Sequence, residues 1–139
     1  WLDRPLKEVF AFFADPMNLE TITPAWLQFT IKTAPQFEMR QGALVDYRLR
    51  LHGIPLAWRS RITVWDPPLK FVDDQVKGPY RLWHHEHTFE KKDGGTLVRD
   101  HVDYAVPGGL LVQKLMVRRE VERIFDFRRR KLAEIFRKA

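Results

Sequence analysis

The sequence contains no cysteine and only one serine, Ser60. The absence of cysteine excludes disulfide bonds, thiolate zinc sites and cysteine nucleophiles. Ser60 lacks the Gly-x-Ser-x-Gly context of a hydrolase nucleophile, which argues against serine catalysis. No run approaches the roughly 18 apolar residues of a membrane span, and no signal-peptide pattern is present. We therefore expect a cytoplasmic protein without a membrane span.

The length of 139 residues fits one ordinary domain with one core. The composition is 45% hydrophobic, 13% aromatic and 30% charged, which is typical of a soluble globular protein with many rings in its interior. The net charge of +6 permits attraction to nucleic acid, anionic membrane or acidic ligands but does not select among them. Because no repeat or linker interrupts the pattern, we expect a single domain over residues 1–139.

The hydrophobic pattern predicts an α+β architecture. Helical periodicity predicts short helices over residues 5–13 and 17–22. Alternation and turn signals predict strands over 27–32, 43–51, 56–65, 70–76, 81–90 and 96–106. A helical pattern then continues from residue 110 to about 136, long enough at 1.5 Å per residue to cross the domain over about 40 Å.

Two turns fix the expected strand pairing. A two-residue link at Gly53-Ile54 fits a type II′ turn, and it predicts Leu49 opposite Trp58 and Asp46 opposite Arg61. The Asp93-Gly94 pair predicts a type I′ turn, with residue 92 paired to residue 95. Counting from this turn, one face of the second hairpin pairs Trp83 with Tyr104, His85 with Val102, His87 with Asp100, and Phe89 with Val98.

The stretch RLWHHEHTFE, residues 81–90, therefore turns His85 and His87 toward the interior together with apolar rings. His84, Glu86 and His101 fall on the opposite face, where a solvated charge ladder is expected. A buried imidazole and a buried carboxylate need partners, and the expected opposition of His87 to Asp100 supplies one.

Three interpretations of His85, His87 and Asp100 remain open. The favoured one is an internal polar pair in the wall of a pocket. The second is a proton-transfer group in which Asp100 orients His87 as an acid or base. The third is a metal site made of two histidines and one carboxylate.

The long helix carries a basic run that includes Arg128, Arg129 and Arg130. This run is able to contact phosphate, but Glu120, Glu122, Asp126 and Glu134 are interspersed along the helix. A solvated outer face is therefore the favoured interpretation, and a basic interaction module for RNA or acidic membrane is the alternative.

The order of two short helices, antiparallel strands and a long terminal helix resembles the helix-grip fold. The stretches GPYRLWHHEHTFE and RDHVDYAVPGG sharpen the likeness: the chain resembles the START-related SRPBCC superfamily, in its polyketide cyclase/dehydrase-like, ligand-binding branch. The resemblance covers nearly the whole chain, and it implies that the first strand is missing, truncated or seen only as Trp1-Leu2.

The resemblance implies a cavity between a curved sheet and the long helix, which binds a small hydrophobic, aromatic or lipid-like molecule. It implies no cofactor and no nucleic acid. A similar domain is also found fused to NAD-binding, epimerase-like proteins, which suggests a functional association with such a protein. The expected ligand-binding residues are Val45, Tyr47, Leu49, Trp58, Ile62, Trp83, His85, His87, Phe89, Val102, Tyr104, Val117, Val121, Ile124 and Phe125.

Ligand binding without catalysis is the favoured function. The alternative is a cyclase- or dehydratase-like enzyme in which His87 acts as base, Asp100 holds its ring, and His85 assists.

Overall fold

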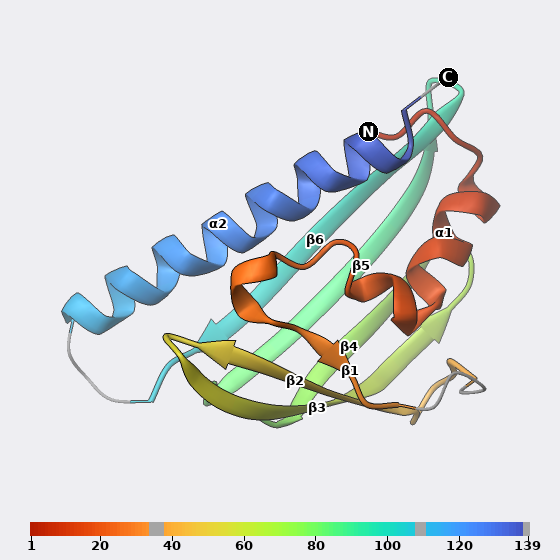
Figure 1. The fold of residues 1–139 in the computed structure, drawn as a ribbon. Coiled ribbons are helices and arrows are strands. Elements are labelled where there is room, and N and C mark those ends of the chain that lie inside the picture. The colour runs from red at the N-terminus through yellow and green to blue at the C-terminus, as the bar shows by residue number, and fades with distance from the viewer. Residues whose placement is uncertain (34–37, 108–110, 138–139) are drawn as a thin grey trace.

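Six antiparallel strands form one sheet in which each strand pairs with the next along the chain (Figure 1). The computed structural model describes residues 1–33, 38–107 and 111–137. The strands are β1 (Thr30–Ile31), β2 (Leu44–Leu51), β3 (Ile54–Asp66), β4 (Lys70–Lys77), β5 (Leu82–Lys92) and β6 (Gly95–Ala105).

The helices lie before and after the sheet in the chain. Helix α1 (Leu6–Ala14) is followed by two 3₁₀ turns, η1 (Pro16–Leu19) and η2 (Ala25–Leu27), and α2 (Leu111–Ile135) closes the chain. Asp15 ends α1 in an extended conformation and its side chain accepts a hydrogen bond from the Met17 amide, which starts η1. The second predicted helix is thus a single 3₁₀ turn that ends at Leu19, three residues before the predicted end. The predicted start of the long helix, residue 110, lies outside the described residues.

The β2–β3 hairpin turns one residue earlier than predicted. Leu51 pairs with Ile54, so His52 and Gly53 form the link, and both have positive φ, 52° and 78°. Two positive φ values are the mark of a type I′ turn, whose twist matches that of the flanking strands. The predicted partners are therefore wrong by two residues: Leu49 faces Leu56, and Asp46 faces Arg59. A shift of two preserves which face each side chain occupies.

The β5–β6 hairpin has the predicted register along its length, from Lys92 opposite Gly95 to Trp83 opposite Tyr104. Asp93 and Gly94 have φ of 50° and 77°, so this link is also a type I′ turn. The predicted inward face of β5 is confirmed, because His85 and His87 are each 3% exposed.

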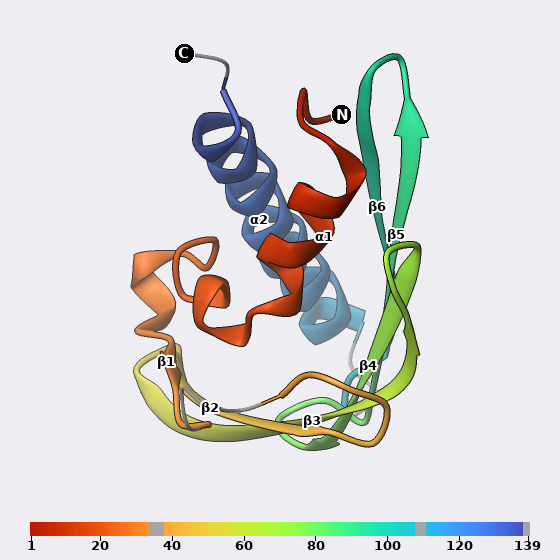
Figure 2. The same ribbon diagram turned by 90° about the vertical axis from the view of Figure 1, so that its right-hand side faces the viewer.

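The sheet is strongly curved, and both helices lie inside the curve (Figure 2). Register shifts interrupt the β3–β4 pairing between Arg59 and Ser60 and between Ile62 and Val64. Irregularities of this kind bend a strand and increase its twist. The curvature leaves the concave side of the sheet facing α1 and α2.

Two apolar clusters occupy this concave side. The first lies where α1 and the last turns of α2 meet the sheet, with Phe10, Phe13, Phe71, Phe89 and Leu132 among its members. The second gathers Leu27, Leu49 and Trp58, with Ile124 of α2 packed against them. The helix-grip fold expected from the sequence is the fold observed. Among the described residues, no helix has the length and apolar character needed to cross a bilayer.

Candidate functional site

A pocket of about 170 Å³ lies between the concave face of the sheet, the η1 and η2 region and α2. Side chains from β2, β3 and β4, from the first half of β5, and from α2 form its walls. Apolar groups predominate, with aromatic rings on several sides: Phe13, Phe29, Tyr47, Trp58, Phe71, Tyr80, Trp83 and Phe125.

Two histidines of β5 lie side by side in the pocket wall. The ring centroids of His85 and His87 are 3.7 Å apart, and His87 stacks on Phe71 at 4.0 Å. Because alternate residues of a strand share a face, the spacing His-x-His brings both rings to the concave side. Phe71 closes one side of the pair, which shields His87 from solvent.

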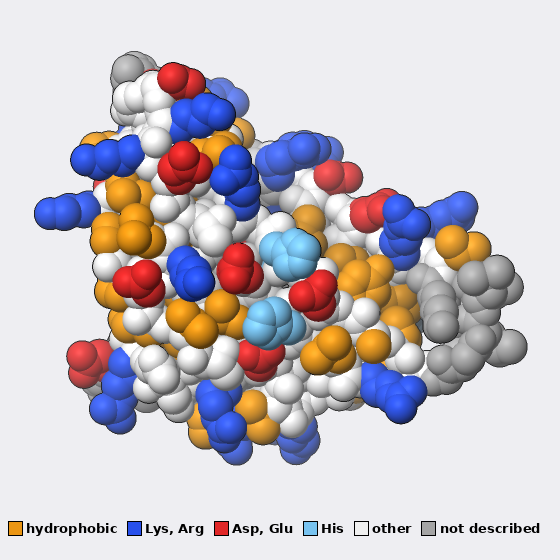
Figure 3. All heavy atoms as spheres, turned by 180° about the vertical axis from the view of Figure 1, so that it is seen from behind, with side chains coloured by type: hydrophobic (Ala, Val, Ile, Leu, Met, Phe, Trp, Pro, Cys, Tyr) orange, Lys and Arg blue, Asp and Glu red, His pale blue; other side chains and the backbone are white. Residues whose placement is uncertain are grey.

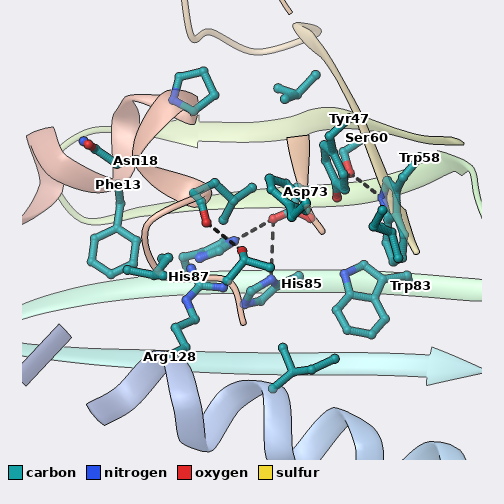
Figure 4. Close-up of a pocket in the computed structure, with 18 of the residues that line it drawn as sticks. Phe13, Asn18, Tyr47, Trp58, Ser60, Asp73, Trp83, His85, His87 and Arg128 are labelled. Carbon is teal, nitrogen blue, oxygen red and sulfur yellow. Dashed lines mark hydrogen bonds and ion pairs between the residues drawn. The ribbon is translucent and has the colours of Figure 1, made fainter. Parts of the chain in front are cut away.

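Each histidine binds a carboxylate on a neighbouring strand. His85 Nε2 lies 2.7 Å from Asp100 Oδ1. His87 Nε2 lies 2.6 Å from Asp73 Oδ2 (Figure 4). Both contacts are diagonal, because the Cα partner of Asp73 is His85 and the Cα partner of Asp100 is His87. Diagonal neighbours in a sheet remain within reach of long side chains.

The expected His87–Asp100 hydrogen bond is therefore not the one formed. His87 Nδ1 is 3.4 Å from Asp100 Oδ1 and has no hydrogen-bond partner among the described residues. The predicted strand pairing is correct, but the pairing of Cα atoms does not determine where an imidazole nitrogen points. The prediction also did not include the second carboxylate, which comes from β4.

Burial affects the pKa of His85, His87, Asp73 and Asp100. Burial lowers the pKa of His85 to about 4, with the neighbouring His87 acting in the same direction. Burial likewise lowers the pKa of His87 to about 3. Both imidazoles are thus neutral at pH 7, and each is able to donate its Nε2 hydrogen to a carboxylate.

The two carboxyl groups differ. Burial raises the pKa of Asp73 above its usual value. Burial acts in the same sense on Asp100, but the positive charge of Arg128 and the hydrogen bond from His85 outweigh it, so the pKa of Asp100 lies below its usual range. The Asp100 side chain retains 23% exposure, which is consistent with an ionised carboxylate.

Arg128 enters the pocket from α2 and is 8% exposed (Figure 4). Its guanidinium lies 5.6 Å from the ring of Phe13 and 5.7 Å from that of Phe125. The expectation of a solvated arginine is wrong for this residue. Arg128 falls four residues after Ile124 and four before Leu132, on the same stripe of the helix, and that spacing was the available signal.

A second polar group lies farther along the pocket. The Ser60 hydroxyl accepts a hydrogen bond from Trp58 Nε1 at 2.9 Å and lies 3.2 Å from the Tyr47 hydroxyl. Burial, followed by the charge of Asp73, raises the pKa of Tyr47 far above its usual value, so the phenol remains protonated. Ser60 is 3% exposed, and its hydroxyl contacts the side chains of Trp58 and Tyr47 and no histidine among the described residues, which agrees with its exclusion as a nucleophile.

The structure brings together most of the side chains expected in the cavity. The expected residues that line the pocket are Val45, Tyr47, Leu49, Trp58, Ile62, Trp83, His85, His87, Val121, Ile124 and Phe125.

Four expected residues do not line this pocket: Phe89, Val102, Tyr104 and Val117. Phe89 packs against Phe10 and Phe13 beneath α1, and Tyr104 packs against Tyr80 and Trp83. For the three sheet residues, facing inward was not sufficient, because the pocket lies over β2, β3, β4 and the first half of β5 and not over the end of β5 or over β6. Asp73 and Arg128 line the pocket but were not among the ligand-binding residues expected from the sequence.

Histidines lie among acidic and basic side chains on the convex face of the sheet (Figure 3). His84 Nδ1 lies 2.6 Å from Asp74 Oδ1, and His101 Nε2 lies 3.3 Å from Asp103 Oδ1. The side chains of His84 and His101 are 41% and 72% exposed. This face is the solvated charge ladder expected from the alternation, although His84 binds Asp74 of β4 rather than Asp103, which is opposite it on β6.

Asp73, His85 and His87 offer three potential metal ligands within 4.8 Å of one another. The expected set contained Asp100 in place of Asp73. Two histidines and one carboxylate form a known ligand set for divalent metals. The arrangement also has features that oppose a metal, since His87 Nε2 and Asp73 Oδ2 already bind each other and the charge of Arg128 acts on Asp73 and His87.

Comparison with known families identifies the chain. Residues 2–131 match the family described as polyketide cyclase / dehydrase and lipid transport. The chain belongs to this family. Among curated proteins, no sequence match is found.

Solved structures of low sequence identity share the fold. Protein CV1439 from Chromobacterium violaceum is 13% identical, with a TM-score of 0.74 over 99% of this chain and 93% of its own. Protein Ms6760 from Mycobacterium smegmatis is 21% identical, with a TM-score of 0.69 over 96% and 85%. Ginseng major latex-like protein 151 from Panax ginseng is 15% identical, with a TM-score of 0.67 over 99% and 93%. At these identities the likeness establishes the helix-grip fold alone.

We predict that His87→Leu destabilises the protein by about 2 kcal/mol or more, since it leaves Asp73 buried without its closest partner. The matched variant His84→Leu, on the convex face, should cost less than about 1 kcal/mol. Urea unfolding followed by tryptophan fluorescence measures both. Equal losses would contradict the inward placement of His87.

We also predict that stability falls on acidification. The pKa values of His85 and His87 in the folded state lie below the unfolded value near 6.5, so the unfolded chain binds more protons below that pH. Stability is therefore fully present above pH 6.5 and is lost as the pH falls toward 4. Between pH 7 and 5.5 the loss from both groups is about 2 kcal/mol.

The raised pKa of Asp73 opposes this trend, because the folded state then binds a proton that the unfolded carboxyl releases, so the wild type is compared with a variant that lacks both histidines. The double variant His85→Gln/His87→Gln should flatten the curve of unfolding free energy against pH. A wild-type curve that is flat over this range would contradict the assignment of neutral, buried imidazoles.

Proposed function

We propose that the protein binds one small hydrophobic, aromatic or lipid-like molecule in the pocket between the sheet and α2. The observation that supports this most strongly is the pocket itself, with many apolar walls and a few convergent polar groups. Such a combination is typical of small-molecule sites, where apolar contact supplies affinity and polar groups fix orientation. The description of the family, which includes lipid transport, points in the same direction.

The energetics favour an apolar ligand body. Each buried 100 Å² of apolar ligand surface contributes about 2.5 kcal/mol, against which the cost of association must be set. Rings such as Trp58, Trp83 and Phe125 present broad apolar surfaces to a ligand. They are already packed against their neighbours, for example Trp58 against Trp83 at 5.4 Å, so little side-chain entropy is lost on binding.

Polar groups in the wall would orient the ligand. His85 and His87 contribute neutral imidazoles at one place, and Ser60 with Tyr47 contributes hydroxyl groups at another. Tyr104, expected among the ligand-binding residues, lies outside the pocket lining. The cytoplasmic location and the association with an NAD-binding, epimerase-like protein stay predictions.

A second candidate is a cyclase- or dehydratase-like enzyme, favoured by the contacts that the two pocket histidines make with carboxylates. Proton transfer near neutral pH is most efficient when the catalytic pKa lies near the working pH. With pKa values of about 4 and 3, His85 and His87 are weak bases, so binding is the better supported function. The third candidate is a basic interaction helix. It is less well supported because Arg128 lies in the pocket and not on the exposed surface of the helix.

We predict that Ile124→Phe weakens binding of a neutral hydrophobic probe such as decanol, because the larger side chain enters the pocket from α2. Loss of about tenfold in affinity is expected from the occupied volume. The control is Ile135→Phe on the same helix, where the side chain is 36% exposed and lies outside the pocket lining. Calorimetric titration of both variants measures the effect, and equal affinities for the two would argue against binding in this pocket.

The enzyme alternative is separated by following the bound molecule. On the binding account, the molecule recovered from protein purified from its own host is returned unchanged after incubation, and mass spectrometry shows the same mass before and after. Conversion to a product by the wild type, lost in His87→Ala while binding persists, would instead establish catalysis.

A further inference from the structure

Arg128 is a buried cation without a direct partner in the part of the chain that the structure describes. Its Nε has no hydrogen-bond acceptor, and the guanidinium forms no ion pair with any described residue. The side chain is 8% exposed and lines the pocket. A guanidinium offers five N–H donors, and leaving them unsatisfied in an apolar environment costs free energy.

The nearby carboxylates do not satisfy it. Asp73 and Asp100 experience the charge of Arg128, but each takes its short hydrogen bond from a histidine. The rings of Phe13 and Phe125 lie near the guanidinium and give weak cation–π attraction, which supplies no hydrogen-bond acceptor. Arg128 therefore retains donors that face the pocket in which the proposed ligand would lie.

We propose that the bound molecule carries a carboxylate and that Arg128 binds it, with the apolar body of the ligand extending toward Trp58 and Trp83. This inference rests on the proposed function, because it requires a ligand in the pocket. The ligand class is thus an acid with an apolar chain or ring system, such as a fatty or aromatic carboxylic acid.

A carboxylate fits this position better than a more highly charged group. The planar guanidinium matches the two oxygens of a carboxylate in a paired, bidentate geometry. Arg128 is the one lysine or arginine among the described residues that line the pocket, and the two oxygens of one carboxylate are enough to accept from its free donors. A phosphate group carries more charge and more acceptor oxygens than one arginine satisfies.

The position of Arg128 also orients the ligand. In Figure 4 the side chain reaches from α2 toward His87, while Tyr47, Ser60 and Trp58 lie at the other end of the row. A carboxylate at Arg128 leaves the apolar part of the ligand among Trp58, Trp83 and Ile124. The carboxylate of the ligand thus lies near His87 and Asp73, and its apolar part lies along Trp58 and Trp83.

The test uses three probes of equal chain length: decanoate, decanol and decylamine. Calorimetric titration is performed on the wild type, Arg128→Met, Arg128→Lys and Arg129→Met. Arg129 is the matched control, because it lies on the same helix, its side chain is 82% exposed and it pairs with Asp126. Circular dichroism and thermal unfolding establish that each variant is folded.

We expect Arg128→Met to weaken decanoate binding by about tenfold or more and to change decanol binding by less than about twofold. Arg128→Lys should retain part of the decanoate affinity, since it keeps the charge but not the planar fork. Arg129→Met should bind both probes as the wild type does. Decylamine should bind the wild type less well than decanol and should gain affinity in Arg128→Met.

Four results would overturn the inference. Decanoate binding that survives Arg128→Met would remove the role of Arg128, and equal losses for decanoate and decanol in this variant would assign it a structural role only. Decanol binding without decanoate binding in the wild type would exclude a carboxylate ligand while leaving the proposed function in place. If none of the three probes binds the wild type, the proposed function fails together with the inference.

Discussion

The register of the β5–β6 hairpin determines what the interior contains. The type I′ turn at Asp93 and Gly94 fixes the pairing, and the alternation of side chains then places His85 and His87 on the concave face. Two imidazoles among phenylalanine and tryptophan rings require hydrogen-bond partners, which Asp73 and Asp100 supply from the strands on either side. A slip of one residue would exchange this face with the solvated one and remove the polar part of the pocket.

The buried polar cluster of His85, His87, Asp73, Asp100 and Arg128 is not expected to maximise the stability of the fold. Replacing buried ionic groups with well-packed apolar side chains is often neutral or stabilising, and His87 Nδ1 and Arg128 Nε both lack hydrogen-bond partners among the described residues. Groups of this kind are concentrated where a protein binds or transforms another molecule. The coincidence of unsatisfied polar atoms with the apolar pocket is the physical basis of the proposed function, and Arg128 gives that function its chemical specificity.

Much of the fold followed from local signals in the sequence. Alternation in residues 43–51 and 81–90, the Asp93-Gly94 turn and the long helical pattern were sufficient to predict β2, β5, β6 and α2. The strand predicted over 27–32 is shorter in the structure, because a 3₁₀ turn occupies Ala25–Leu27 and β1 contains only Thr30–Ile31. The β2–β3 turn was misplaced because Gly53 fits both a type I′ and a type II′ link, and only pairing of Leu51 with Ile54 decides between them. The site was harder to predict, since hydrogen bonds across three strands depend on sheet curvature. The hydrophobic pattern nevertheless places Asp73 and Arg128 on inward faces. Asp73 follows the buried Phe71 by two residues on a strand, and Arg128 precedes the buried Leu132 by four residues on a helix.

The most direct measurement is a crystal structure of the protein in complex with decanoate. The account predicts electron density for the acid in the pocket, with both carboxylate oxygens within hydrogen-bond distance of the Arg128 guanidinium and the alkyl chain against Trp58 and Trp83. Density in the reverse direction, with the carboxylate in solvent and the chain end at Arg128, would contradict the central claim. So would a complex in which the acid binds elsewhere and aromatic side chains fill the pocket.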